Sequence, residues 1–119
     1  MAALSDHAEK LILDWMMTAG AATRPTAWYV ALYTAAPSDS GGGTELSGSG
    51  YARESVTFAA ATSGTGTTSN TGVVVFTADG GDWGSVTHMG IHDAVSGGNL
   101  LWHGALAAAK TVADGDTLE

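Results

Sequence analysis

The stretch that most constrains the fold is residues 82–104, which have the pattern of a β-hairpin. Two arms rich in apolar, aromatic and β-branched residues flank the small polar residues 96–99. Gly97 and Gly98 stand at the centre of the turn, where tight hairpin connections need positive φ angles that glycine adopts at little cost. The sequence therefore predicts an antiparallel hairpin whose structural turn is Gly97, Gly98 and Asn99.

Other strand-like segments lie on both sides of the hairpin sequence. Residues 27–34 are nearly apolar throughout, which indicates a central strand buried on both faces. Long Ser/Gly/Thr-rich stretches at 38–50 and 62–72 are predicted to be exposed loops. Strands are expected at 27–34, 51–59, 73–77, 85–93 and 100–106, with a last strand beginning at 111–112. Short strands joined by Gly-rich turns indicate an all-β protein, an antiparallel β-sandwich or barrel of jelly-roll-like type.

One helix is expected, over residues 5–18. Ser5 or Asp6 can cap its first N–H groups, Glu9 completes a capping box, and Gly20 ends the segment. Its apolar face carries Leu4, Ala8, Leu11, Ile12, Trp15 and Met16. The chain is accordingly divided into an N-terminal amphipathic helix, residues 1–20, and a β-sandwich domain, residues 21–119.

Two interpretations of the helix face remain open. The face can pack on the sheet of its own domain. Alternatively, Leu4, Leu11, Ile12, Trp15 and Met16 can form assembly contacts with a neighbouring subunit, because an uncovered apolar patch attracts a partner.

Charge and composition exclude several partners. The formal net charge is −8, and four Lys and Arg residues cannot form the basic surface that nucleic acid or an anionic membrane requires. No apolar run approaches the ~20 residues that span a bilayer, and without cysteine the fold uses no disulfide. Only 13% of residues are charged, against roughly 25% in typical soluble domains. Either another subunit covers part of the surface, or small polar residues do.

Three histidines and several aspartates are candidate metal ligands. His88 and His92 share a strand face and His103 lies on the partner strand, with Asp93 nearby. However, residues four apart in a strand are roughly 13 Å apart, too far to bind one ion. Cross-strand pairing or subunit contact is the favoured role of these histidines.

The aspartates beside glycines suggest a second type of metal site. Asp79, Asp82, Asp114 and Asp116 could supply oxygen ligands to calcium, although their spacing does not match an EF-hand loop. The alternative is ordinary turn chemistry, in which Asp bonds the local backbone. We therefore expect no metal at either set of residues.

Enzyme motifs are lacking. The sequence has no nucleophile elbow and no Cys–His arrangement, and the Gly41–Gly43 run lacks the lysine of a P-loop. We expect no catalysis and no cofactor. Trp28, Tyr29 and Tyr33 form either a ligand surface on which sugar rings stack or part of the core.

Eight short segments, in order, resemble small structural proteins of tailed bacteriophages, the phage tail-fibre-like family. They are Leu4–Asp6, Val30–Thr34, Pro37–Asp39, Gly50–Arg53, Val56–Ala59, Asp82–His88, Gly97–Leu101 and Lys110–Val112. The resemblance implies a non-enzymatic virion protein that acts through subunit–subunit contacts. Proteins of this kind usually continue beyond the position of Glu119, which leaves a final strand expected outside this sequence.

The function expected from these observations is that of a tail-fibre-like or accessory surface protein of the virion. Its partners would be other virion proteins and further copies of itself, in a homo-oligomer of three or more subunits. Capsid decoration, a place at the head–tail connector, and binding of a host-surface glycan or protein receptor are the alternatives. Both the tail and the head surface are compatible locations.

Overall fold

The predicted hairpin forms the middle of the main sheet. In the computed structural model, which describes residues 2–119, its strands are β6 (Gly84–His92) and β7 (Leu100–Val112). They pair antiparallel, with register shifts between Val86 and His88 and between Ile91 and His92. Gly97 and Gly98 in the turn adopt φ angles of 62° and 68°.

The main sheet is antiparallel throughout and is ordered β1–β7–β6–β2–β3, with β4 on the same edge of β2 as β3. The additional strands are β1 (Ala2–Leu4), β2 (Tyr29–Ala35), β3 (Thr44–Glu45) and β4 (Glu54–Ser55). β2 is flanked on both sides and contains three consecutive buried residues. This central place agrees with its apolar and aromatic sequence.

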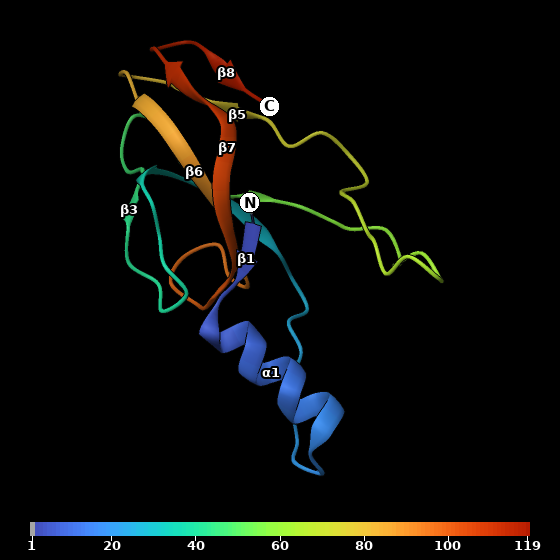
Figure 1. Cartoon of the computed structure of the whole chain (residues 1–119). Helices are drawn as coiled ribbons and strands as arrows, with labels where there is room; N and C mark the ends of the chain where they lie inside the picture. The colour runs from blue at the N-terminus through green and yellow to red at the C-terminus, as the bar shows by residue number, and fades with distance from the viewer. Residues whose placement is uncertain (1) are drawn as a thin grey trace.

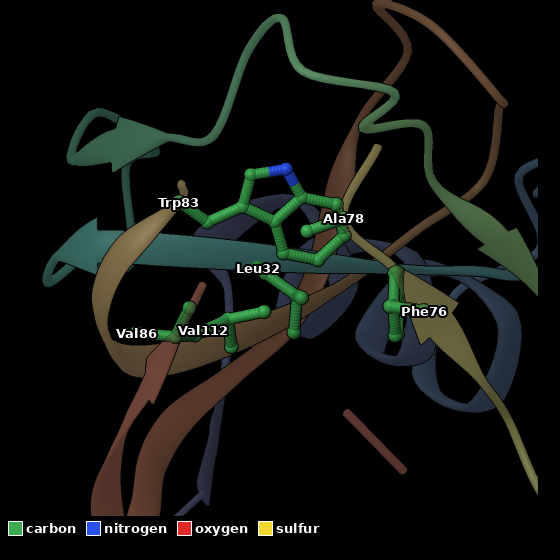
Figure 2. Close-up of a cluster of buried hydrophobic side chains, with 6 residues drawn as sticks. All are labelled: Leu32, Phe76, Ala78, Trp83, Val86 and Val112. Atoms are coloured by element: carbon green, nitrogen blue, oxygen red, sulfur yellow. The ribbon is translucent and has the colours of Figure 1, made fainter. Parts of the chain in front are cut away.

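A small second layer covers one end of the sheet. It is a two-stranded ribbon of β5 (Phe76–Thr77) and β8 (Thr117–Leu118). The core lies between the layers, where the indole of Trp83 packs near Leu32 (Figure 2). The buried members of the cluster are Leu32, Phe76, Ala78, Trp83, Val86 and Val112. The all-β class with antiparallel sheets and one N-terminal helix is therefore confirmed.

Helix α1 (Asp6–Met17) lies at the opposite end of the molecule from the β5–β8 ribbon (Figure 1). Ser5 is its N-cap and accepts a hydrogen bond from the backbone N–H of Ala8. The predicted helix boundaries are thus correct to within one residue at each end. With the helix at one end, the molecule measures 49 × 28 × 23 Å.

Residues 57–71 form an extended arm that leaves the body of the protein (Figure 1). Its two sides are joined by backbone hydrogen bonds, from Ala59 to Ser69 and from Thr71 to Thr57. No charged residue occurs between Glu54 and Asp79. The arm is therefore an uncharged projection from a strongly acidic chain.

Several predicted boundaries were wrong. The strand expected at 51–59 is reduced to the two residues of β4, because the chain after Val56 enters the arm. Residues 111–112 end β7 instead of starting a strand, and the Asp114–Gly115–Asp116 turn leads into β8. Leu4 lies in β1, opposite Trp102 of β7, and not on the helix. Residues at the N-terminus therefore contribute a strand to the sheet.

Candidate assembly site

The end of α1 carries the largest group of exposed apolar side chains. Trp15 is 73% exposed and Met17 is 74% exposed, and Ile12, Leu13 and Met16 are exposed beside them. Ala8 is the only buried residue of the helix, and Leu11 is half-buried. Only the first part of this face, at Ala8 and Leu11, packs on the body of the protein, because the rest of the helix extends past the sheet's end (Figure 1).

Around the last two turns, apolar side chains do not keep to one stripe. At 100° per residue, Leu11, Ile12 and Leu13 point in three different directions. Trp15, Met16 and Met17 repeat these directions one turn later. A helix that is apolar on most sides is normally buried, so this exposed end has the character of an interface.

The base of α1 is fixed to the body by polar contacts. Ser5 is 1% exposed, and its hydroxyl donates to the Leu100 carbonyl while its backbone N–H donates to Leu101. The Asp6 N–H donates to the carbonyl of Asp39, whose carboxylate pairs with His103 at 2.7 Å. These contacts hold the first turn in place while the last turns project outward.

Arg53 connects the long loop to the hairpin turn. Its guanidinium pairs with both carboxylate oxygens of Glu45 at 2.8 Å and donates to the carbonyls of Ala94 and Gly97 at 2.9 Å. The Arg53 side chain is almost entirely buried. Partial burial alone would raise the pKa of Glu45, but hydrogen bonds from Arg53 and Tyr51 lower it below its ordinary value. The pair is therefore ionised and part of the fold.

Tyr33 and His92 form a buried cross-strand pair between β2 and β6. The Tyr33 hydroxyl and His92 Nε2 share a hydrogen bond of 2.7 Å, and the rings lie nearly parallel. Burial, followed by the positive charge of Arg53, lowers the pKa of His92. Burial and then the Glu45 carboxylate raise the pKa of Tyr33. Both side chains are therefore neutral at pH 7.

Trp28, Tyr29 and Tyr33 do not share one exposed surface. Strand alternation puts Tyr29 and Tyr33 on the same face of the sheet and Trp28 on the other. Tyr33 is buried, while Trp28 packs edge-to-face against Phe58 with ring centroids 6.5 Å apart. The arrangement separates the three rings, so they cannot stack together on one sugar.

The candidate metal ligands are likewise used in separate contacts. His92 pairs with Tyr33, His103 with Asp39, and His88 with Thr87. Within residues 2–119, no three His, Cys, Asp or Glu side chains gather in a way that could hold a metal ion.

Three of the four aspartates beside glycines accept hydrogen bonds from the backbone, and two of these bonds join residues 80–82 to Asp114 across the fold. Asp114 accepts from Gly80 at 2.9 Å, Asp82 accepts from Asp114 at 2.8 Å, and Asp116 accepts from Ala113. Only the Asp116 bond is the local turn chemistry expected as the alternative to calcium binding. Asp93 similarly accepts from Asn99 across the hairpin turn.

An apolar groove lies on the face of the main sheet that the β5–β8 ribbon only partly covers. Its volume is about 670 Å³. The sheet and the arm both contribute to its walls, with Val30, Met89, Ile91, Leu106, Phe58 and Val74 among the lining residues. No residue of α1 reaches it.

Sequence reasoning did not identify this groove or the Arg53–Glu45 pair. Glu45 lies in the predicted loop at 38–50 and Arg53 lies eight residues later, in the segment predicted as a strand. No periodic signal in the sequence connects them. The groove combines strands distant in the sequence. One signal was available for the groove, namely the long uncharged stretch between Glu54 and Asp79 in a chain of net charge −8.

No helix in the described part of the chain is long and apolar enough to cross a membrane.

Comparison with curated proteins gives no match. A family described as podophage GP4 fiber I protein gp80 matches residues 3–119, almost the whole chain. Its name agrees with the predicted resemblance to tail-fibre proteins and supports a place on the virion tail, whereas no finding supports the head surface. The exposed helix end and the elongated all-β body thus belong to a phage structural protein, and the chain is a member of the podophage GP4 fiber I protein gp80 family.

Proposed function

We propose that this chain is a non-enzymatic fibre subunit that joins neighbouring virion proteins through the projecting end of α1. The observation that carries the proposal is the exposure of Trp15 and of the apolar residues around it. Exposed patches of this kind on an otherwise folded domain mark interaction sites. We propose Leu11, Ile12, Trp15 and Met16 as the contact set, and we add Leu13 and Met17 because their side chains are also exposed. Leu4 is left out because it lies in β1.

The way in which the helix is held supports this role. Its first turn is anchored through Ser5 and Asp6, while its last two turns leave the sheet. Such an element presents apolar side chains on a fixed base and loses little conformational freedom when it binds. Other virion proteins and further copies of this chain are the expected partners.

The test is incorporation of a Trp15→Ala chain into phage particles. Loss of an exposed side chain should change the free energy of unfolding by no more than about 0.5 kcal/mol. An interface tryptophan commonly contributes about 2 kcal/mol or more to binding. We therefore expect a folded chain that is strongly depleted from particles.

Trp102→Ala is the matched control, because Trp102 is also exposed, at 43%, but belongs to β7 and not to the last turns of the helix. Particles containing the Trp102→Ala chain at normal level and lacking the Trp15→Ala chain would support the proposal. Normal incorporation of both chains would contradict it.

A polar hollow favours a second candidate function, recognition of a saccharide on the host surface. The hollow, of about 560 Å³, opens between the base of α1, residues 39–42 and the hairpin turn. Asp6, His7 and Asn99 line it, and polar groups of this kind can bond sugar hydroxyls. Glycan-array binding that is lost in His7→Ala and kept in Glu9→Ala, a change on the same helix outside the hollow, would support this function. Absence of any retained glycan would exclude it.

A further inference from the structure

We infer that the projecting end of α1 docks into the apolar groove of a second copy of this chain, so that subunits join head to tail. The inference rests on the proposed assembly role of α1 and adds the surface that receives it. The helix end and the groove are both apolar, and the described residues leave both uncovered. One is convex and the other is concave.

The groove has the size and chemistry that the helix end needs. At about 670 Å³, it lies within the ~300–1,000 Å³ range of pockets that bury small ligands, which leaves room for a few large side chains. Its walls are mainly aliphatic and aromatic. Trp15 and Met16 are the largest side chains at the helix end, and both are mostly exposed.

The helix cannot fill the groove of its own chain. Ser5 and Ala8 fix the first turn of α1 beside β7, and the main contacts of the helix are with β1 and β7. The groove lies towards the β5–β8 ribbon and the arm, away from the helix (Figure 1). The occupant must therefore come from another molecule.

Charge favours a second copy at this place. Most surfaces of a chain with net charge −8 repel one another. The groove is an exception, because residues 55–78 on its arm side carry no charge and Lys110 lies at its rim. Lys110 takes part in no ion pair among residues 2–119, and Asp14, the one acidic residue in the last two turns of α1, already pairs with Lys10, so the docking end brings no unpaired carboxylate into the groove. Glu119 also lines the groove and is the one carboxylate there.

The contact joins two different surfaces and is therefore heterologous. Contacts of this type close into rings or continue as filaments, or they form a reciprocal pair in which the helix end of each copy enters the groove of the other. Each copy has a free helix end and a free groove at different places on an elongated body. One contact type is thus sufficient for a linear or ring-shaped assembly.

Two complementary variants test this directly. The helix variant Trp15→Asp with Met16→Asp keeps the groove. The groove variant Val73→Asp with Ala108→Asp keeps the helix, and both of its positions are exposed. Ala107→Arg, at another exposed groove position, replaces it if the double variant proves unfolded by circular dichroism.

Sedimentation velocity of the full chain should show concentration-dependent association of the wild type. Each variant alone should be monomeric, with association weakened about 30-fold or more, which corresponds to the ~2 kcal/mol of an aromatic hot spot. An equimolar mixture should form dimers and nothing larger, because one helix variant and one groove variant share a single intact contact.

Three results would overturn the inference. The first is a mixture of folded variants that stays monomeric, and the second is a groove variant that associates like the wild type, which would indicate helix–helix or arm contacts. The third is a wild type that stays monomeric, which would assign the helix to another virion protein. In each case, loss of the Trp15→Ala chain from particles would leave the proposed function standing, so the two failures are distinguishable.

Discussion

Two tryptophans at opposite ends of this molecule have opposite environments. Trp83 is 6% exposed and packs near Leu32 (Figure 2). It also packs against Tyr51, and its indole N–H donates to the Ser49 carbonyl at 2.9 Å. Trp15 is 73% exposed on the last turns of α1. The same residue type is thus part of the internal core at one end and uncovered at the other.

The difference shows where the chain completes its own fold. At the Trp83 end, a second layer of two short strands is enough to enclose the core. At the helix end, no second layer follows, although the residues are equally apolar. Burial of the helix end would require another molecule. A change at Trp83 should therefore affect stability, whereas a change at Trp15 should affect assembly.

Trp83→Ala should have the largest effect. It removes a buried aromatic side chain and leaves a cavity, which typically costs about 3–5 kcal/mol. We expect the free energy of unfolding measured with urea to fall by this amount, or the chain not to fold at 25 °C. Trp15→Ala should leave the free energy of unfolding within about 0.5 kcal/mol of the wild-type value. Equal effects of the two substitutions would remove the distinction between the ends.

Arg53→Met should have the next largest effect, because it removes the partner of a partly buried carboxylate. It also leaves the carbonyls of Ala94 and Gly97 without their donor. We expect a loss of about 2–3 kcal/mol. Lys10→Met is the control, since its ion pair with Asp14 is exposed and such pairs contribute about 0.5 kcal/mol or less. If both variants unfold at the same urea concentration, the Arg53 network does not stabilise the fold.

Gly98→Ala should cost about 2–3 kcal/mol, more than Gly97→Ala at about 1 kcal/mol. Both residues have positive φ, which disfavours a side chain. A Cβ at Gly98 would also lie 2.7 Å from the Ala94 Cβ, whereas one at Gly97 meets nothing within 4 Å. Thermal midpoints of the two variants give the comparison. A Gly97→Ala protein that melts first would mean that crowding does not govern this turn.

His92 should produce the smallest effect, a dependence of stability on pH. Burial lowers its pKa in the folded protein, so the unfolded chain binds the proton more readily. Stability should therefore fall as pH decreases through the ordinary histidine pKa of about 6.5. The variant His92→Gln keeps a hydrogen-bonding group but does not titrate.

Urea unfolding between pH 5 and 8 should show a smaller decrease for the His92→Gln protein than for the wild type. A parallel pH dependence of both proteins would assign the effect to other histidines. Glu45 affects a separate, more acidic pH range. Its pKa is lowered in the folded protein, so the stability that it contributes is lost only when pH falls below the ordinary pKa of glutamate.

The sequence predicted the local elements well where the signal is periodic or turn-specific. The hairpin around Gly97 and Gly98, the helix after Ser5 and the central strand at Tyr29–Ala35 all occur at or close to the expected positions. It failed where pairing depends on distant segments. Few residues of β1, β8 and the arm are in regular structure. Their conformation depends on the segments with which they pair, which are β7, β5 and the opposite side of the arm.

The sequence indicated the apolar residues of the candidate site but not their exposure. The apolar character of Leu11, Ile12, Trp15 and Met16 could be recognised from their spacing in the sequence. Whether the sheet covers these residues depends on how far β7 and β1 extend beside the helix. Hydrophobic periodicity along the sequence does not predict how far strands extend. The Arg53–Glu45 pair and the groove were missed for the same reason.

The sequence by itself determined the all-β class, the single helix, the hairpin turn and the acidic charge. These follow from residue periodicity, glycine positions and composition, which act over a few residues or over the chain as a sum. Only the tertiary structure decided which apolar side chains are enclosed and which are left exposed. Burial depends on contacts between segments far apart in the chain, and for that reason Trp83 became core while Trp15 remained available to a partner.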